Sequence, residues 1–277
     1  MSARAGPGNR RRERGVGEDR RNVLHRGLGH HDQFARIAPY YDLLMASVPY
    51  ARWADYVSDL ALLARRPIVP GSRLLDLATG TGSVALEFAN RGCEVTGLDL
   101  SEPMLEVARA KAQAAGRSIE FLPRDLVKFS LPPEFDHALC LYDSLNYILN
   151  ADRLKQAFAN VRHALNSNGV FIFDVNTIRA LEAEMFTQAS GPNAVVRYRW
   201  QSKYQPKVKL TEVRMDFEIA ATGEKIHVVH RQRGYTDEEI RSLLSQAGFG
   251  EIQGYDGYRF QPPTPSSDRV FYVALPR

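Results

Sequence analysis

The stretch Leu74-Leu75-Asp76-Leu77-Ala78-Thr79-Gly80-Thr81-Gly82 decides the fold class of this chain. An apolar run of strand length passes into a glycine-containing turn, and a helical pattern begins immediately after it. Glycine lets the backbone pass close to a ligand and adopt dihedral angles that other residues avoid. Amide groups exposed at the start of the helix favour a negatively charged group. The stretch therefore predicts a site for an anionic group between a strand and a helix.

Strands and helices alternate along the chain around this stretch. The predicted strands are residues 73–78, 94–99, 118–122, 135–141 and 169–175, and the helices between them are residues 82–90, 101–115 and 151–165. Strands that alternate with helices of this length indicate right-handed βαβ units and a parallel sheet. Two helical segments come before the first strand, at residues 32–46 with a break around Pro39 and at residues 50–64. We expect them to form a helical cap over residues 32–66.

The pattern changes at residue 178. Residues 195–204, 209–219 and 225–230 alternate between apolar and polar, which indicates an antiparallel sheet. A capping box at Thr236–Glu239 then opens a helix that stops at Gly248, and strands at residues 250–258 and 269–274 follow. The sequence therefore predicts an α/β core over residues 31–177 and 234–277, with an antiparallel insert over residues 178–233 as a substrate lid.

Positive charge is concentrated at the start of the chain. The net charge is +4; eight Arg and three acidic residues within residues 1–26 contribute +5, so the rest carries −1. We expect residues 1–30 to be a disordered basic tail, and such an arm leaves RNA binding open. No apolar run approaches the ~18 residues of a membrane span, and the cysteines lack zinc-site spacing. These features predict a cytoplasmic protein without a metal centre or a membrane partner.

Two cofactor classes fit the glycine motif. Gly80-x-Gly82-x-x-Ala85 also satisfies the GxGxxG/A fingerprint of dinucleotide-binding enzymes, and Asp99 lies at the spacing of a ribose contact. A nicotinamide-dependent oxidoreductase is therefore an alternative. Asp76 argues against it, because a turn that accepts pyrophosphate usually has an apolar residue there, whereas a cofactor with an ammonium group tolerates an acid. The motif also lies behind two helices, whereas dinucleotide folds commonly start with it.

Several segments together resemble one enzyme family. They are FARIAPYYDLLM at residues 34–45, PYARWADY at 49–56, the glycine motif, GLDLSEP at 97–103 and YDSLNYIL at 142–149. They resemble a group of uncharacterised bacterial class I S-adenosylmethionine-dependent methyltransferases and, more distantly, bacterial sugar N,N-dimethyltransferases. The resemblance covers residues 32–176 and the end of the chain. It implies an α/β, Rossmann-like seven-stranded sheet with helices on both faces and a last strand antiparallel to the others.

The resemblance implies S-adenosylmethionine as the cofactor. Asp99 would accept hydrogen bonds from both ribose hydroxyls. Asp125-Leu126 would read the adenine, with Met104 packed near the base. Tyr41 and Trp53 would close over the cofactor. The expected cofactor-binding residues are Tyr41, Trp53, Asp76, Ala78, Thr79, Gly80, Gly82, Asp99, Leu100, Met104, Asp125, Leu126 and Leu141.

The segment after the fourth strand faces the methyl group in this fold. Asp143 and Tyr147 are the candidate catalytic residues there, with Asn146 beside them. Methyl transfer needs alignment of the reacting atoms, and it needs a base only where the acceptor arrives protonated. The (Asn/Asp)-Pro-Pro-Tyr and Pro-Cys signatures of nucleobase-methylating enzymes are absent from the sequence. We therefore expect transfer to a nitrogen or oxygen of a small molecule, with an RNA methyltransferase and a non-catalytic cofactor-binding protein as alternatives.

We expect the insert to supply the substrate lid, and it carries aromatic and basic side chains. These are Tyr198, Trp200, Tyr204, His227, His230, Arg231 and Arg233. Arginines that faced the site would favour an acidic acceptor. The other interpretation of the basic group is a solvated strand face.

Overall fold

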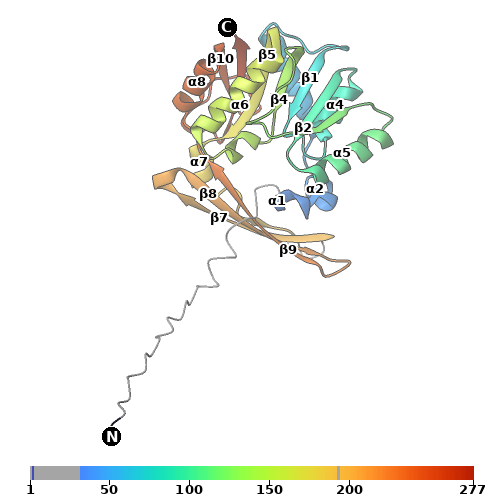
Figure 1. Ribbon diagram of the computed structural model, residues 1–277, viewed down its shortest axis with the longest axis vertical. Coiled ribbons are helices and arrows are strands. Elements are labelled where there is room, and N and C mark those ends of the chain that lie inside the picture. Colours follow the sequence, from blue (N-terminus) through green and yellow to red (C-terminus); the bar gives the residue numbers. More distant parts are fainter. Residues whose placement is uncertain (1, 3–31, 192–193) are drawn as a thin grey trace. The chain divides into compact units, whose positions relative to one another are not determined.

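The structure is a computed structural model that describes residues 2, 32–191 and 194–277. The tail predicted at residues 1–30 lies outside the described residues, apart from residue 2. Within these residues, seven strands form the central sheet in the order β10-β11-β5-β4-β1-β2-β3 (Figure 1). Their bounds are β1 Arg73–Leu77, β2 Glu94–Asp99, β3 Glu120–Pro123, β4 Phe135–Cys140, β5 Leu165–Asn176, β10 Phe249–Asp256 and β11 Arg269–Pro276.

The strand directions confirm the predicted sheet. β1 to β5 are parallel to one another, β11 is antiparallel to β5, and β10 is antiparallel to β11. Helices cover both faces, so β1, β4 and residues 169–176 of β5 are almost entirely buried and rich in apolar side chains. One face carries α3 Tyr50–Leu63, α4 Ser83–Asn90 and α5 Glu102–Ala114, and the other carries α6 Ala151–Ala164 and α8 Asp237–Gln246.

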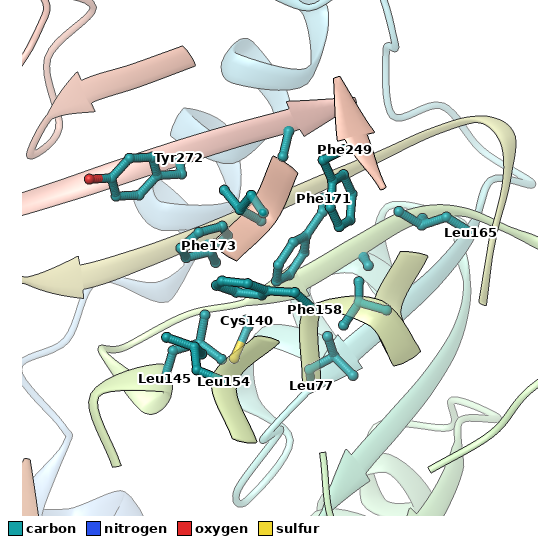
Figure 2. Packing of buried hydrophobic residues seen from close by; sticks show 14 of the residues in the cluster. Leu77, Cys140, Leu145, Leu154, Phe158, Leu165, Phe171, Phe173, Phe249 and Tyr272 are labelled. Atoms are coloured by element: carbon teal, nitrogen blue, oxygen red, sulfur yellow. The ribbon is translucent and has the colours of Figure 1, made fainter. Parts of the chain in front are cut away.

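Aromatic side chains dominate the face under α6 and α8. Figure 2 shows Phe158 of α6 lying against Phe171 and Phe173 of β5, with Phe249 and Tyr272 of the last strand pair beside them. Phe171 and Phe173 stack with ring centroids 4.7 Å apart, and Phe173 stacks on Tyr272 at 5.2 Å. Burying a side chain of this size contributes roughly 1.5–3 kcal/mol. This packing fixes β11, which carries Arg269 to the site described below.

A second sheet forms the insert. Its order is β6-β7-β8-β9, with β6 Gln188–Ala189, β7 Val196–Gln205, β8 Leu210–Ile219 and β9 Lys225–Arg233, and all neighbours are antiparallel (Figure 1). One face is apolar and buries Val213, Met215 and Phe217. That face packs with residues of α1 Asp32–Ala35 and α2 Ala38–Leu44. The first two helices and the insert therefore share one apolar cluster.

The structure departs from the sequence predictions at short elements. The break predicted around Pro39 lies at Arg36-Ile37, and Pro39 itself lies in the first turn of α2, where its missing amide costs no hydrogen bond. The short helix η1 Ser144–Tyr147 has Asp143 as its N-cap residue, an alternative that the sequence left open for this acid. Elements that were not predicted are α7 Ile178–Glu182, β6 and η2 Pro206–Val208. They are too short to show a periodic pattern. Among the described helices, none combines the length and apolar character that a membrane crossing requires.

Candidate active site

The carboxyl ends of the parallel strands meet at one edge of the sheet. The strand order reverses between β1 and β4, and ligands of open α/β sheets bind at such a switch point. The predicted residues lie along this edge. Asp76 lies near the end of β1 and residues 78–82 connect β1 to α4. Asp99 ends β2, Asp125 follows β3, and Leu141–Asp143 follow β4.

The glycine loop, residues 78–82, has left-handed backbone at alternate positions. The φ angle is +53° at Ala78, +56° at Gly80 and +74° at Gly82. A Cβ at Gly82 would lie 2.9 Å from Cβ of Ala108 in α5, so the close approach of this helix requires glycine. A Cβ at Gly80 would meet no atom within 4 Å. This open space, next to the start of α4, fits a cofactor that places an anionic group against the loop.

Asp76 is a buried acid beside the glycine loop. It is 2% exposed, and Thr79 Oγ1 donates a hydrogen bond to its Oδ2 at 2.5 Å. Burial raises the pKa of Asp76 to about 7; the Thr79 hydrogen bond opposes this rise and the charge of Asp99 adds to it. A cationic group near the loop would lower this pKa again. Asp76 therefore suits a cofactor that carries an ammonium group.

Asp99 ties the second strand to the glycine loop. Its Oδ2 accepts a hydrogen bond from the Gly80 amide and its Oδ1 accepts one from the Ser101 amide, both at 2.8 Å. A carboxylate has about four acceptor positions, so these bonds are compatible with contacts to ribose hydroxyls. Nearby, Leu100 is 36% exposed, whereas Met104 in the first turn of α5 is buried.

Asp125 and Leu126 form a turn after β3. Asp125 Oδ1 accepts a hydrogen bond from the Val127 amide at 2.9 Å, and its Oδ2 lies 3.6 Å from the guanidinium of Arg153 in α6. The Leu126 carbonyl accepts a hydrogen bond from Asn160 at 3.0 Å. These contacts fix the turn at the sheet edge, and its contact with adenine stays a prediction.

The turn after β4 has two consecutive left-handed residues. Tyr142 and Asp143 have φ angles of +65° and +50°. Such backbone at a non-glycine residue costs about 1–3 kcal/mol and persists only where its surroundings hold it. Asp174 of β5 provides this support, because its two carboxylate oxygens accept hydrogen bonds from the Tyr142 and Asp143 amides at 2.7 and 3.0 Å.

Arg269 joins two carboxylates at the same turn. Its guanidinium donates hydrogen bonds to Asp174 and, at 2.8 Å, to Oδ1 of Asp143. Gln232 of β9 donates to the other oxygen of Asp143 at 2.6 Å. Burial raises the pKa of Asp174, and the charge of Arg269 opposes this rise. Because both oxygens of Asp143 accept hydrogen bonds, the geometry favours a positioning role for this residue over that of a base.

Tyr147 faces the antiparallel sheet. Its hydroxyl lies 3.1 Å from Nδ1 of His230 on β9. The ring of Phe34 packs against both side chains, with centroid distances of 5.9 Å to Tyr147 and 4.5 Å to His230. Burial raises the pKa of Tyr147, with a further rise from Asp143. The side chain is therefore a neutral hydroxyl at physiological pH.

Asn146 has a structural role in this region. Its Nδ2 donates to the carbonyls of Asn176 and Arg233 at 3.1 and 2.9 Å, and its Oδ1 accepts from the Asn176 amide at 3.0 Å. The side chain is fully buried. It joins the end of β5 to the end of β9, and so connects the core sheet to the antiparallel sheet.

Tyr41 and Trp53 approach the turn after β4 from the first helices. Burial raises the pKa of Tyr41, and the charges of Tyr50 and Tyr142 add to this rise. Trp53 stacks on Tyr142 with centroids 5.3 Å apart and an interplanar angle of 26°. The guanidinium of Arg269 lies 5.7 Å from the Trp53 ring. Trp53 thus supports the turn, and its contact with the cofactor stays a prediction.

The basic residues of the insert separate onto different sides of β9. His227 and Arg231 are exposed and pair with Asp216 at 2.5 Å and with Glu212 at 3.1 Å. Arg233 donates to the Leu149 carbonyl and pairs with Glu239. His230 is buried at Tyr147, and Tyr198, Trp200 and Tyr204 lie on the same face of β7 as buried Val196. Arg231 and Arg233 thus pair with acids of the insert and of α8, so they do not give the support for an acidic acceptor that arginines facing the site would give.

Comparison with known proteins identifies the class of this fold and site. Residues 74–169 match the methyltransferase domain family. The chain is 30% identical over 247 residues to a putative methyltransferase of Geobacillus sp. (strain WCH70), across 87% of this chain and 98% of that one. It is 27% identical over 256 residues to the dTDP-3-amino-3,6-dideoxy-alpha-D-glucopyranose N,N-dimethyltransferase of Streptomyces fradiae, across 88% and 92% of the two chains.

A solved structure agrees with these relatives. An S-adenosylmethionine-dependent methyltransferase from Clostridium acetobutylicum has a TM-score of 0.76 and 25% identity, over 90% of this chain and all of that one. The chain belongs to the class I S-adenosylmethionine-dependent methyltransferases. The predicted enzyme class, fold and cofactor are confirmed, which sets aside the nicotinamide-dependent alternative. The roles of the individual site residues remain predictions.

Proposed function

We propose that this enzyme transfers the methyl group to a nitrogen or oxygen of a small molecule, and that an amine is the favoured acceptor. The observation that carries this proposal is the charge beside the turn after β4. Asp143 and Asp174 share the guanidinium of Arg269. This cluster has no net positive charge in either ionisation state of Asp174. An acidic acceptor would therefore find no cation to bind it there.

Aromatic side chains around the cluster suit the same acceptor class. Tyr142 and Tyr147 belong to the turn and to η1, and Phe34 and Tyr41 approach from α1 and α2. Aromatic faces attract cations, with about 0.5–2 kcal/mol per contact depending on solvation. They would bind the ammonium form of an amine, which must release a proton to water before its nitrogen lone pair can accept the methyl group. The S. fradiae relative is named as an N,N-dimethyltransferase of an amino sugar, which is consistent with an amine.

Alignment is the main task of the residues that hold the cofactor. When bound, S-adenosylmethionine supplies a methyl group activated by its sulfonium sulfur. We assign the amides of the glycine loop to the methionine carboxylate, Asp99 to the ribose and Asp125 to the adenine. Tyr147 is assigned to contact the acceptor, and Asp143 to hold the turn that carries Tyr142. The antiparallel sheet and α1–α2 act together as the lid over the acceptor side of the site, which comprises Asp143, Tyr147, Asp174, Gln232 and Arg269.

RNA is the less favoured acceptor. Outside residues 1–26 the chain carries a net charge of −1, whereas nucleic-acid binding relies on phosphate neutralisation by Lys and Arg. The exposed Arg231 and His227 on β9 already pair with acidic neighbours. We therefore favour a small molecule, and the test below includes RNA.

The first test measures the cofactor. Titration calorimetry should give binding of S-adenosylmethionine and S-adenosylhomocysteine and none of NAD(H). Asp99→Ala should weaken both adenosyl ligands about 10- to 100-fold, the worth of a hydrogen bond to a charged group. Asp59→Ala, an exposed acid on α3, is the matched control and should bind as the wild type does. Equal affinities of the two variants would overturn the assignment of Asp99.

The second test measures the acceptor. Tritium-labelled S-adenosylmethionine is incubated with the enzyme and either a low-molecular-mass bacterial extract or total RNA. We expect label in the small-molecule fraction, and its loss when the extract is first treated with an amine-selective acetylating reagent. Label that survives acetylation would replace the amine by a hydroxyl acceptor. Label in RNA alone would overturn the proposal.

A further inference from the structure

A polar cluster outside the predicted cofactor residues links three elements. Oδ1 of Asp42 in α2 accepts a hydrogen bond from Thr81 Oγ1 at 2.7 Å, and its Oδ2 lies 2.6 Å from Nζ of Lys111 in α5. Lys111 Nζ also donates to Ser83 Oγ at 2.9 Å and reaches Thr81 Oγ1 at 3.3 Å. Thr81 is 3% exposed and lies between the glycines of the loop. One carboxylate thus attaches α2 to the glycine loop.

The residue next to Asp42 reaches the other side of the site. The ring of Tyr41 packs edge-on against Phe34 with centroids 6.3 Å apart, and Phe34 packs against Tyr147 at 5.9 Å. Burial also raises the pKa of Tyr41. α2 packs against α5 and β7, and Figure 1 shows α1 and α2 between α5 and the antiparallel sheet. α2 therefore touches the cofactor loop with one side chain and the acceptor side with the next.

We propose that Asp42 and Lys111 are positioning residues that couple the glycine loop to the acceptor side through α2. A ligand that fixes the loop fixes Thr81, the Asp42 carboxylate then fixes α2, and α2 holds Tyr41 in place. The cofactor would therefore bind first and complete the acceptor side. This inference rests on the proposed placement of the cofactor at the glycine loop.

The exposure of the pair supports a reversible contact. The side chains of Asp42 and Lys111 are 42% and 23% exposed, so solvent and salt partly screen their attraction. A contact of this kind holds α2 weakly while the loop is unliganded. It strengthens when the loop becomes rigid, because less freedom is then lost on forming it.

Hydrogen exchange followed by mass spectrometry tests the coupling without a known acceptor. In the wild type, S-adenosylhomocysteine should slow exchange about tenfold or more in peptides of the glycine loop and of α2. In Asp42→Asn, which keeps the size of the side chain, we expect the loop protection to remain and the α2 protection to be lost. Lys111→Met should behave in the same way, and the double variant should lose no more than either single variant.

The matched control is Asp55→Asn. It removes the 2.8 Å ion pair between Asp55 of α3 and Arg91, which also joins two elements but lies outside the cluster. Both protections should persist in this variant. Protection of α2 that survives Asp42→Asn, or that falls additively in the double variant, would overturn the coupling. A wild-type enzyme whose loop gains no protection from S-adenosylhomocysteine would instead overturn the cofactor placement, and the coupling with it.

Discussion

The cofactor side of the site lies at the carboxyl ends of β1, β2 and β3 and on the turns that follow them, whereas the acceptor side combines side chains from the turn after β4 and from β5, β9 and β11. On the cofactor side we assign the ligand contacts largely to backbone amides, and the Asp99 carboxylate accepts hydrogen bonds from the Gly80 and Ser101 amides. On the acceptor side, Asp143, Asp174, Arg269 and Gln232 hold one another through side chains. The cofactor side therefore depends on the backbone geometry of its turns and on Asp99, whereas the acceptor side depends on pairs between side chains of distant elements.

Removal of Arg269 from the acceptor side should cause the largest loss in the free energy of unfolding. Arg269→Met leaves Asp143 and Asp174 buried without their shared cation, and breaking a buried pair costs about 3–5 kcal/mol. The Arg269 side chain is 17% exposed, so screening reduces this cost only in part. Urea unfolding measures the change in the free energy of unfolding.

Two further variants test whether the loss of stability in Arg269→Met comes from the buried ion pairs. Arg259→Met removes an exposed guanidinium paired with Asp256 at 3.1 Å and should change stability by less than about 1 kcal/mol. Adding Asp174→Asn to Arg269→Met should recover part of the loss, because one buried charge disappears. Equal losses in Arg269→Met and Arg259→Met would mean that the acceptor side does not depend on its ion pairs.

The same difference explains what the sequence could predict. The glycine loop, Asp99 and Asp125 each lie at the end of a predictable strand, so their meeting at one edge follows from parallel topology. Arg269, Gln232 and Asp174 could not be predicted as site residues, because their partners are far away in the chain. Asp174 did leave a signal, as an acid within the apolar strand of residues 170–175. Burial of an acid there implies a partner, but the sequence does not say which one.

A substitution at Gly82 tests how strongly the cofactor side depends on its backbone geometry. Gly82→Ala places a Cβ 2.9 Å from Ala108 in left-handed backbone. The backbone strain and the overpacking together should cost about 2–4 kcal/mol and weaken S-adenosylhomocysteine binding. Gly116→Ala is the matched control, because its φ is +64° but a Cβ there meets no atom within 4 Å. If both variants lost the same stability, the close approach of α5 would not matter.

Asp76 should make the stability of the cofactor side depend on pH. Its pKa is about 7 in the folded chain and about 3.9 when unfolded. The folded state therefore binds more protons between these values, so this contribution is full below pH 4 and is lost as pH rises through 7. Between pH 5 and pH 7 the loss should be about 2 kcal/mol relative to Asp76→Asn. Urea unfolding at several pH values measures it, and parallel curves for the two proteins would contradict the prediction.

Replacement of Arg231 should have the smallest effect on stability and on methyl transfer. It tests whether the outer face of the antiparallel sheet belongs to the acceptor side. The Arg231 side chain is 55% exposed and pairs with Glu212, so Arg231→Gln should change stability by less than about 0.5 kcal/mol. Methyl transfer to the extract fraction should stay within about twofold of the wild type. A selective loss of transfer to acidic compounds would show that this arginine binds substrate. The acceptor side would then extend beyond the buried cluster, and the preference for an amine would lose its physical basis.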